Sequence, residues 1–224
     1  MRSFVILTTA MLLALAGCVT MPDPVPADYL VDKTAEQGKA LEKLENSIIA
    51  KNHEIKTLKD REEAAKQKVK VEKGRLDILK DEKKLLEEKK KQYQLENDIA
   101  NIDENNKQMA IKDAEIKTQE TKLEHGKAAF EFARAQREVG ETELAVMVAE
   151  LNYEKSRIAR EYLVKRYVAN PPAEGDKKKA ADPDKYDEQY RKYLDKQRQT
   201  LVDKRNARDE ASMKLKIAED KLKN

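Results

Sequence analysis

The sequence predicts an all-α protein: a long coiled-coil helix, with antiparallel hairpin or three-helix-bundle packing towards the C-terminus. Three observations predict this fold class. Charged residues make up 40% of the 224 residues and aromatic residues only 5%, so the chain can bury narrow stripes but not a broad core. Proline is absent between residues 28 and 170. Apolar residues recur there with the 3.5-residue period of coiled coils.

The first 17 residues have the organisation of an export signal. A short positive segment, residues 1–3, precedes an apolar run, residues 4–15, which is too short for the roughly 20 residues of a membrane-spanning helix. The run ends in Leu15-Ala16-Gly17-Cys18. This motif resembles the lipobox of bacterial lipoproteins. The resemblance implies cleavage before Cys18 and acylation of its thiol with palmitate-type chains. A generic secretory signal or a chance apolar N-terminus is the alternative.

The resemblance also implies a location. An acylated Cys18 would attach the chain to a lipid bilayer in the cell envelope, because each buried methylene contributes about 0.8 kcal/mol. In the enteric lipoproteins that the motif resembles, Asp after the cysteine favours the inner membrane. Val19 occupies that position here. We therefore expect the periplasmic face of the outer membrane.

Residues 18–27 are predicted to be the lipidated cysteine and a tether. Pro22, Pro24 and Pro26 block helix formation and favour extended polyproline II. At about 3.1 Å per residue, residues 19–27 would hold the rest of the chain roughly 25–30 Å from the lipid. A disordered spacer would have the same effect.

Residues 28–79 are predicted to form a coiled-coil stalk. The core positions of its heptads, continued to residue 86, are Leu41, Leu44, Ile48, Lys51, Ile55, Leu58, Glu62, Ala65, Val69, Glu72, Leu76, Leu79, Lys83 and Leu86. Ten of these fourteen are apolar, and β-branched residues alternating with Leu favour parallel dimers. Because a lone stalk cannot cover this seam, we expect a homo-oligomer, a parallel dimer, with the four charged positions fixing its register.

Residues 80–169 are predicted to form a helical hairpin. The apolar stripe changes phase near Tyr93 and continues as Leu95, Ile99, Ile102, Asn106, Met109, Asp113, Ile116, Glu120 and Leu123. We interpret the neighbouring Asn97, Asn101, Asn105 and Asn106 as solvated helix surface. Gly126 is the expected turn, since glycine readily ends helices. The alternatives are a helix that continues through Gly126 and one unbroken helix to residue 169. Residues 144–151, apolar almost all round, should be the most buried part.

Residues 170–183 are predicted to be a loop and residues 184–224 the last helix. Two prolines end the preceding helix, and Asp182 or Asp184 can cap the next one. We expect three antiparallel helices of similar length, residues 80–124, 127–169 and 184–223. The candidate partner-binding residues are Tyr186, Tyr190, Tyr193, Lys177, Lys178 and Lys179. For the lysine run, the alternatives are a solvated linker and contact with anionic headgroups or murein carboxylates.

No constellation of catalytic or cofactor-binding residues is recognisable in the sequence, so we expect neither an enzyme nor a cofactor. His53 and His125 lie in charged stretches far apart, which is typical of surface residues rather than metal ligands. There is no phosphate-binding glycine loop and no nucleophile elbow. With a formal net charge of +3 spread over 46 basic and 43 acidic residues, the chain gives no electrostatic reason to expect nucleic acid binding.

The sequence favours a membrane-anchored structural or adaptor lipoprotein that presents helices to envelope proteins. One alternative is a peptidoglycan linker, similar to the major outer-membrane lipoprotein of enteric bacteria. That protein ends in a murein-linked Lys, whereas this sequence ends in Asn224, so only non-covalent murein binding stays open. The other alternative is an accessory subunit of a transport or secretion complex, because residues 143–154 are faintly similar to the periplasmic hairpins of outer-membrane efflux proteins.

Overall fold

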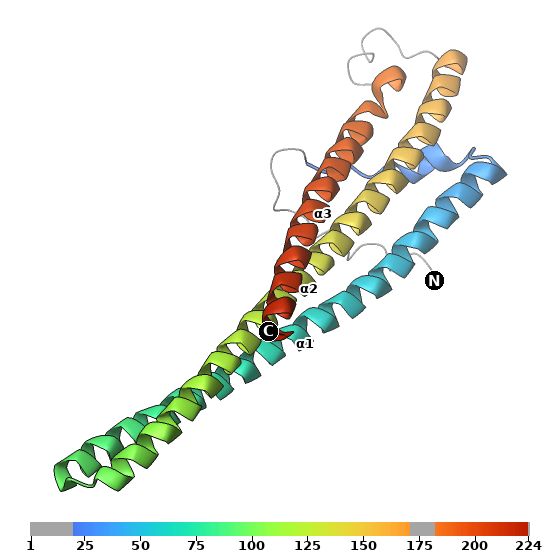
Figure 1. The fold of residues 1–224 in the computed structure, drawn as a ribbon. Coiled ribbons are helices and arrows are strands. Elements are labelled where there is room, and N and C mark those ends of the chain that lie inside the picture. Colours follow the sequence, from blue (N-terminus) through green and yellow to red (C-terminus); the bar gives the residue numbers. More distant parts are fainter. Residues whose placement is uncertain (1–19, 171–181, 224) are drawn as a thin grey trace. The chain divides into compact units, whose positions relative to one another are not determined.

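The structure, a computed structural model, describes residues 20–170 and 182–223 of the chain (Figure 1). Its elements in chain order are η2 (Ala27–Leu30), α1 (Ala35–Glu96), α2 (Ile99–Ala169), η3 (Pro183–Lys185) and α3 (Glu188–Lys223). The described part of the chain contains no strand, and α1 and α2 pack against each other and against α3. The all-α prediction is therefore confirmed, including the hairpin of long helices.

The chain divides into two compact units. Unit 1 combines Met1–Leu41 with Ala149–Lys196, and unit 2 combines Glu42–Val148 with Gln197–Asn224. Each of the three α-helices contributes residues to both units. The contacts described below lie within one unit or the other.

The turn between α1 and α2 consists of Asn97 and Asp98. Asn97 has a φ of 54°, the left-handed conformation that asparagine tolerates better than most residues. Asp98 then caps α2, because its Oδ1 accepts a hydrogen bond from the Asn101 amide at 3.2 Å. One residue ends the first helix and the next begins the second. The phase change near Tyr93 marks this turn.

The predicted turn at Gly126 is wrong, because α2 continues through this residue from Ile99 to Ala169. Gly126 is buried, and a Cβ added there would lie 3.7 Å from Cγ2 of Val69. An added methyl group would therefore make only an ordinary van der Waals contact with α1, and the Lys127 that follows the glycine provides no cap for a new helix. The alternative of one unbroken helix to residue 169 is also wrong, since the chain turns at Asn97.

The predicted heptad seam of α1 faces inward along its whole length. Ile55, Leu58 and Leu76 are buried, and no seam residue from 41 to 86 is exposed. The partner of this seam in unit 2 is α2: a Cβ on Gly140 would touch Ile55 and Leu58. The apolar stripe that led us to expect a dimer is therefore covered within the chain.

On the inner face of α2, the apolar positions agree with the prediction and the polar positions do not. Ile102, Met109 and Ile116 are half-buried and Leu123 is buried, as expected. The alternating core positions are Asn105, Lys112 and Gln119, one residue before the predicted Asn106, Asp113 and Glu120. Asn105, with only 4% of its surface exposed, is not the solvated residue that we expected.

The third helix packs against the half of α2 that follows residue 123. In unit 2, Lys221 pairs with Glu124 at 3.2 Å and Lys204 with Glu138 at 2.8 Å, so α3 runs antiparallel to α2. Among the described residues, the α2 segment 99–123 pairs with α1 only. The three-helix part therefore contains residues predicted as a stalk, and residues 80–123 form a two-helix hairpin instead of belonging to a three-helix head.

The last helix begins later than the sequence predicts. α3 begins at Glu188, four residues after the predicted start, because η3 precedes it. Residues 144–151 are well buried but are not the most buried part of the described chain, because Ser156 and Ala159 further along α2 are 0% exposed. The least exposed residues between 144 and 151 are Ala145 at 3% and Ala149 at 1%.

Candidate functional site

The clearest non-helical feature of unit 1 is the segment of residues 20–34, which we call the strap. Residues 20–26 have no regular structure, in agreement with their three prolines, and η2 follows. Pro22, Val25 and Leu30 are half-buried, so the strap packs on the unit. A capping box then starts α1: the Thr34 amide donates to Gln37 Oε1 at 2.9 Å and the Gln37 amide donates to Thr34 Oγ1 at 3.2 Å.

The strap is fixed through four tyrosine rings, which we call the tyrosine cluster: Tyr29, which belongs to the strap, and Tyr162, Tyr186 and Tyr190. The Tyr29 ring stacks on Tyr162 of α2 with centroids 5.7 Å apart and meets the edge of Tyr186 at 6.0 Å. Tyr186 lies 6.0 Å from Tyr190 of α3. Such aromatic pairs contribute about 0.5–1.5 kcal/mol each beyond the area that they bury.

A hydrogen bond fixes the strap nearer its N-terminal end. The Tyr190 hydroxyl donates to the backbone carbonyl of Asp23 at 2.7 Å, and the Tyr190 side chain is almost completely buried. Burial raises the pKa of Tyr190 above its ordinary value of 10.0, and burial together with the neighbouring Tyr190 hydroxyl raises the pKa of Tyr186 as well. Both rings therefore remain neutral donors throughout the neutral pH range.

The structure shows how far the tyrosines predicted for partner binding are exposed. Tyr190 and Tyr193 are only 3% and 8% exposed, and Tyr186 is half-buried. Tyr190 and Tyr193 therefore offer little surface to a separate partner protein, whereas part of Tyr186 is accessible, and partner binding by these tyrosines stays a prediction. The other candidate partner residues, Lys177, Lys178 and Lys179, lie outside the described residues, as does Cys18.

The predicted stand-off tether is also different in the structure. The prolines do prevent a helix, but Asp23 is bonded to α3 and Tyr29 is stacked on α2. The segment is therefore fixed to unit 1 at Asp23 and at Tyr29, although most of its side chains are exposed, so its described part is not a free spacer. Periodicity could not reveal this, since the strap has none. The available signal was Tyr29 itself, an aromatic residue directly after a proline-rich segment.

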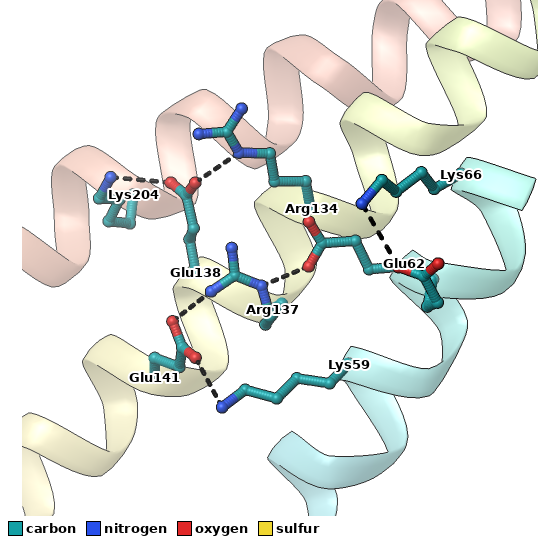
Figure 2. A network of polar contacts seen from close by, with 9 residues as sticks. Lys59, Glu62, Lys66, Arg134, Arg137, Glu138, Glu141 and Lys204 are labelled. Carbon is teal, nitrogen blue, oxygen red and sulfur yellow. Dashed lines mark hydrogen bonds and ion pairs between the residues drawn. The ribbon is translucent and has the colours of Figure 1, made fainter. Parts of the chain in front are cut away.

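Unit 2 has a different kind of polar site, an ionic network across its three helices (Figure 2). Arg137 of α2 binds Glu62 of α1 and, one turn along its own helix, Glu141, which also pairs with Lys59 at 3.4 Å. Glu138 accepts hydrogen bonds from Lys204 of α3 at 2.8 Å and from Arg134 at 3.1 Å. About two turns of α2, residues 134–141, are thereby joined to both α1 and α3.

Glu143 extends this network. Its carboxylate pairs with Lys51 of α1 and with Arg205 of α3, the latter at 2.8 Å. Burial opposes ionisation, but the hydrogen bonds from Arg205 and Lys51 outweigh it and lower the pKa of Glu143. The hydrogen bond from Lys204 likewise lowers the pKa of Glu138. Both carboxylates are therefore held in their charged form.

The four charged residues of the α1 seam all have partners on α2. Lys51 pairs with Glu143 and Glu62 with Arg137, as described above, and Lys83 pairs with Asp113 at 2.7 Å. The fourth, Glu72, is buried, and its Oε2 accepts a hydrogen bond from Gln119 Nε2 at 2.6 Å. These pairs form only in one alignment of the two helices, so they specify the register of the hairpin.

The described residues show no grouping suited to metal chemistry. Across residues 20–170 and 182–223, no cluster of three His, Cys, Asp or Glu side chains could hold a metal ion. His53 is exposed on α1, and Nε2 of His125 on α2 lies 4.0 Å from Oε1 of Glu219. Within the same ranges, no helix combines the length and the hydropathy needed to cross a bilayer.

Comparison with known proteins gives no relative. No protein-family model, curated protein or solved structure matches the chain.

Proposed function

We propose that this chain is a lipid-anchored helical protein of the bacterial cell envelope, acting as a structural or adaptor protein on the periplasmic face of the outer membrane. The observation that carries the proposal is the motif Leu15-Ala16-Gly17-Cys18 at the end of a twelve-residue apolar run. Cys18 is the only cysteine, so no other thiol competes for the acyl group. The absence of a catalytic constellation in the sequence favours a role in binding or spacing over one in catalysis.

The arrangement of the helices supports an adaptor more than a passive fibre. In unit 2, three helices are joined by ion pairs and present mostly charged outer faces, a surface on which a protein partner can be recognised by charge. Hydrophobic residues are also exposed on it, including Ile78 at 60% and Ile217 at 59%. A membrane anchor would concentrate such a surface at one lipid layer.

Metabolic labelling tests the anchor. Cells expressing the full chain are fed an alkyne-bearing palmitate analogue, and the labelled lipid is measured on the purified protein and on Cys18→Ser. We expect label and membrane sedimentation for the wild type and neither for Cys18→Ser. An unlabelled wild-type chain in the soluble fraction would contradict the proposed anchor.

Photo-cross-linking in intact cells tests the adaptor role. The reactive residue belongs at exposed positions such as Ile78 and Ile217, because one at the buried Tyr190 would react with the chain itself. A discrete non-self adduct that is lost with Cys18→Ser would support an adaptor. Adducts with the chain alone, or sedimentation with murein, would replace it with a spacer or a peptidoglycan linker.

A further inference from the structure

The strap determines how far unit 1 can lie from whatever holds Cys18. The first tertiary contact that fixes the strap is the hydrogen bond from Tyr190 to the Asp23 carbonyl. Only five residue steps separate Cys18 from Asp23. Fully extended, they span at most about 16–18 Å.

The same chain would reach much further if the strap were not docked. Helix α1 begins at Ala35, seventeen residue steps after Cys18. An undocked, fully extended segment of that length reaches about 55–60 Å. The tyrosine cluster therefore shortens the tether to about a third of its possible length.

The contacts that shorten the tether are specific. The Tyr29 ring stacks on Tyr162 and meets Tyr186 edge-on, and Tyr190 is buried with its hydroxyl bonded to the strap backbone. The half-buried Pro22 and Val25 add apolar contact on either side of Asp23. Proline also limits the conformations of the undocked segment, which reduces the entropy lost on docking.

We propose that the docked strap holds the surface of unit 1 from which it emerges, marked by Met21 and the first turns of α3, against the bilayer that carries acylated Cys18. This inference rests on the proposed lipid anchor, and it names the lipid surface as the partner of unit 1. The tyrosine cluster is the latch that keeps unit 1 at the membrane. Met21, 40% exposed between the anchor and the latch, is the side chain of the strap placed to enter the headgroup region.

Energy transfer to the lipid surface tests the inference. The full acylated chain is purified with Lys192→Cys, whose native side chain is 69% exposed and lies half a turn from Tyr190. Because Cys18 is acylated, the new thiol alone takes a donor fluorophore. The protein is reconstituted into vesicles of phosphatidylethanolamine and phosphatidylglycerol with an acceptor on a fraction of the headgroups.

Two changes should each lower the transfer efficiency at least twofold without releasing the protein from the vesicles. The first, Tyr29→Ala with Tyr190→Phe, removes the latch. The second inserts about ten Gly and Ser residues between Val19 and Thr20, which lengthens the tether and leaves every contact of the fold intact. Tyr93→Ala, which removes a ring from unit 2, is the matched control and should leave the efficiency unchanged.

The possible failures are distinguishable. Efficiency that is the same in the wild type, the latch variant and the insertion variant, with all three acylated and vesicle-bound, would overturn the inference and leave the lipid anchor standing. A wild-type chain that carries no acyl group would overturn the proposed function, and the docking with it.

Discussion

Each of the two units is stabilised internally by a different kind of contact. Unit 1 contains seven of the eight tyrosines, and the four of the tyrosine cluster fix a segment that has no periodic pattern. Unit 2 contains the charged seam and the ionic network around Arg137. The difference shows how each part solves its own problem. A non-periodic strap needs large rings and a directed hydrogen bond, whereas long helices that could slide along each other need pairs that match in only one register.

Replacing the central ring of unit 1 should have the largest effect. Tyr190→Ala removes a buried aromatic ring and the hydrogen bond to Asp23, and we expect a loss of about 3–5 kcal/mol from the stability of unit 1. Near-UV circular dichroism during urea unfolding measures it, because the tyrosine signal comes almost wholly from that unit. Tyr93→Ala, at a half-buried position of α1, should cost clearly less. Equal losses would remove the contrast between the units.

Placing a larger side chain at Gly140, where α1 and α2 lie close together, should have the next largest effect on stability, in this case on that of unit 2. A Cβ at Gly140 would already lie 2.9 Å from Leu58 Cδ1, so Gly140→Leu should cost about 1–3 kcal/mol through overpacking. Gly74→Leu is the matched control, since nothing lies within 4 Å of a Cβ there. That variant should gain up to about 1 kcal/mol of helix propensity. Urea unfolding followed by far-UV circular dichroism compares the two, and a stabilised Gly140→Leu would contradict the packing described here.

The two units should respond to opposite extremes of pH. The pKa values of Glu138 and Glu143 are lower in the folded chain than the ordinary 4.5, so their contribution to unit 2 is present above pH 4.5 and is lost as the pH falls through the lower folded values. The pKa values of Tyr186 and Tyr190 are raised above 10.0. Their contribution to unit 1 is present below pH 10.0 and is lost as the pH rises beyond it.

Thermal unfolding at a series of pH values checks this pair of expectations. Helix signal from unit 2 should weaken first in acid, and the tyrosine near-UV signal should weaken first in alkali. Loss of the tyrosine signal before the helix signal in acid would show that the assignment of the two chemistries to the two units is wrong.

Removing the ion pairs of a single carboxylate should have the smallest effect on the stability of unit 2. Glu138→Gln ends the charge interaction with Lys204 and Arg134 but keeps a similar shape, and partly exposed pairs contribute only about 0.2–1 kcal/mol. The loss, measured by urea unfolding at low salt, should shrink in high salt because ions screen the pair. A salt-independent loss would point to packing instead.

The sequence determined the periodic part of this protein. The seam of α1 from Leu41 to Leu86 was predictable residue by residue, because a 3.5-residue apolar repeat has only one face to bury. The phase change near Tyr93 and the asparagines beside it also marked the true turn. The prediction of a turn at Gly126 was wrong because a glycine is compatible both with a turn and with a continuing helix, and α2 continues through this one.

Only the tertiary structure decided which surfaces meet. Repetition in the sequence could not say whether the α1 seam pairs with a second copy or with α2, since both choices bury the same apolar residues. Partners such as Glu143 for Lys51 and Asp113 for Lys83 lie far away in sequence, and folding back at Asn97 brings them together. The strap and its tyrosine cluster depend even more on long-range contacts. Tyr190 and Asp23 are 167 residues apart, and no local pattern connects them.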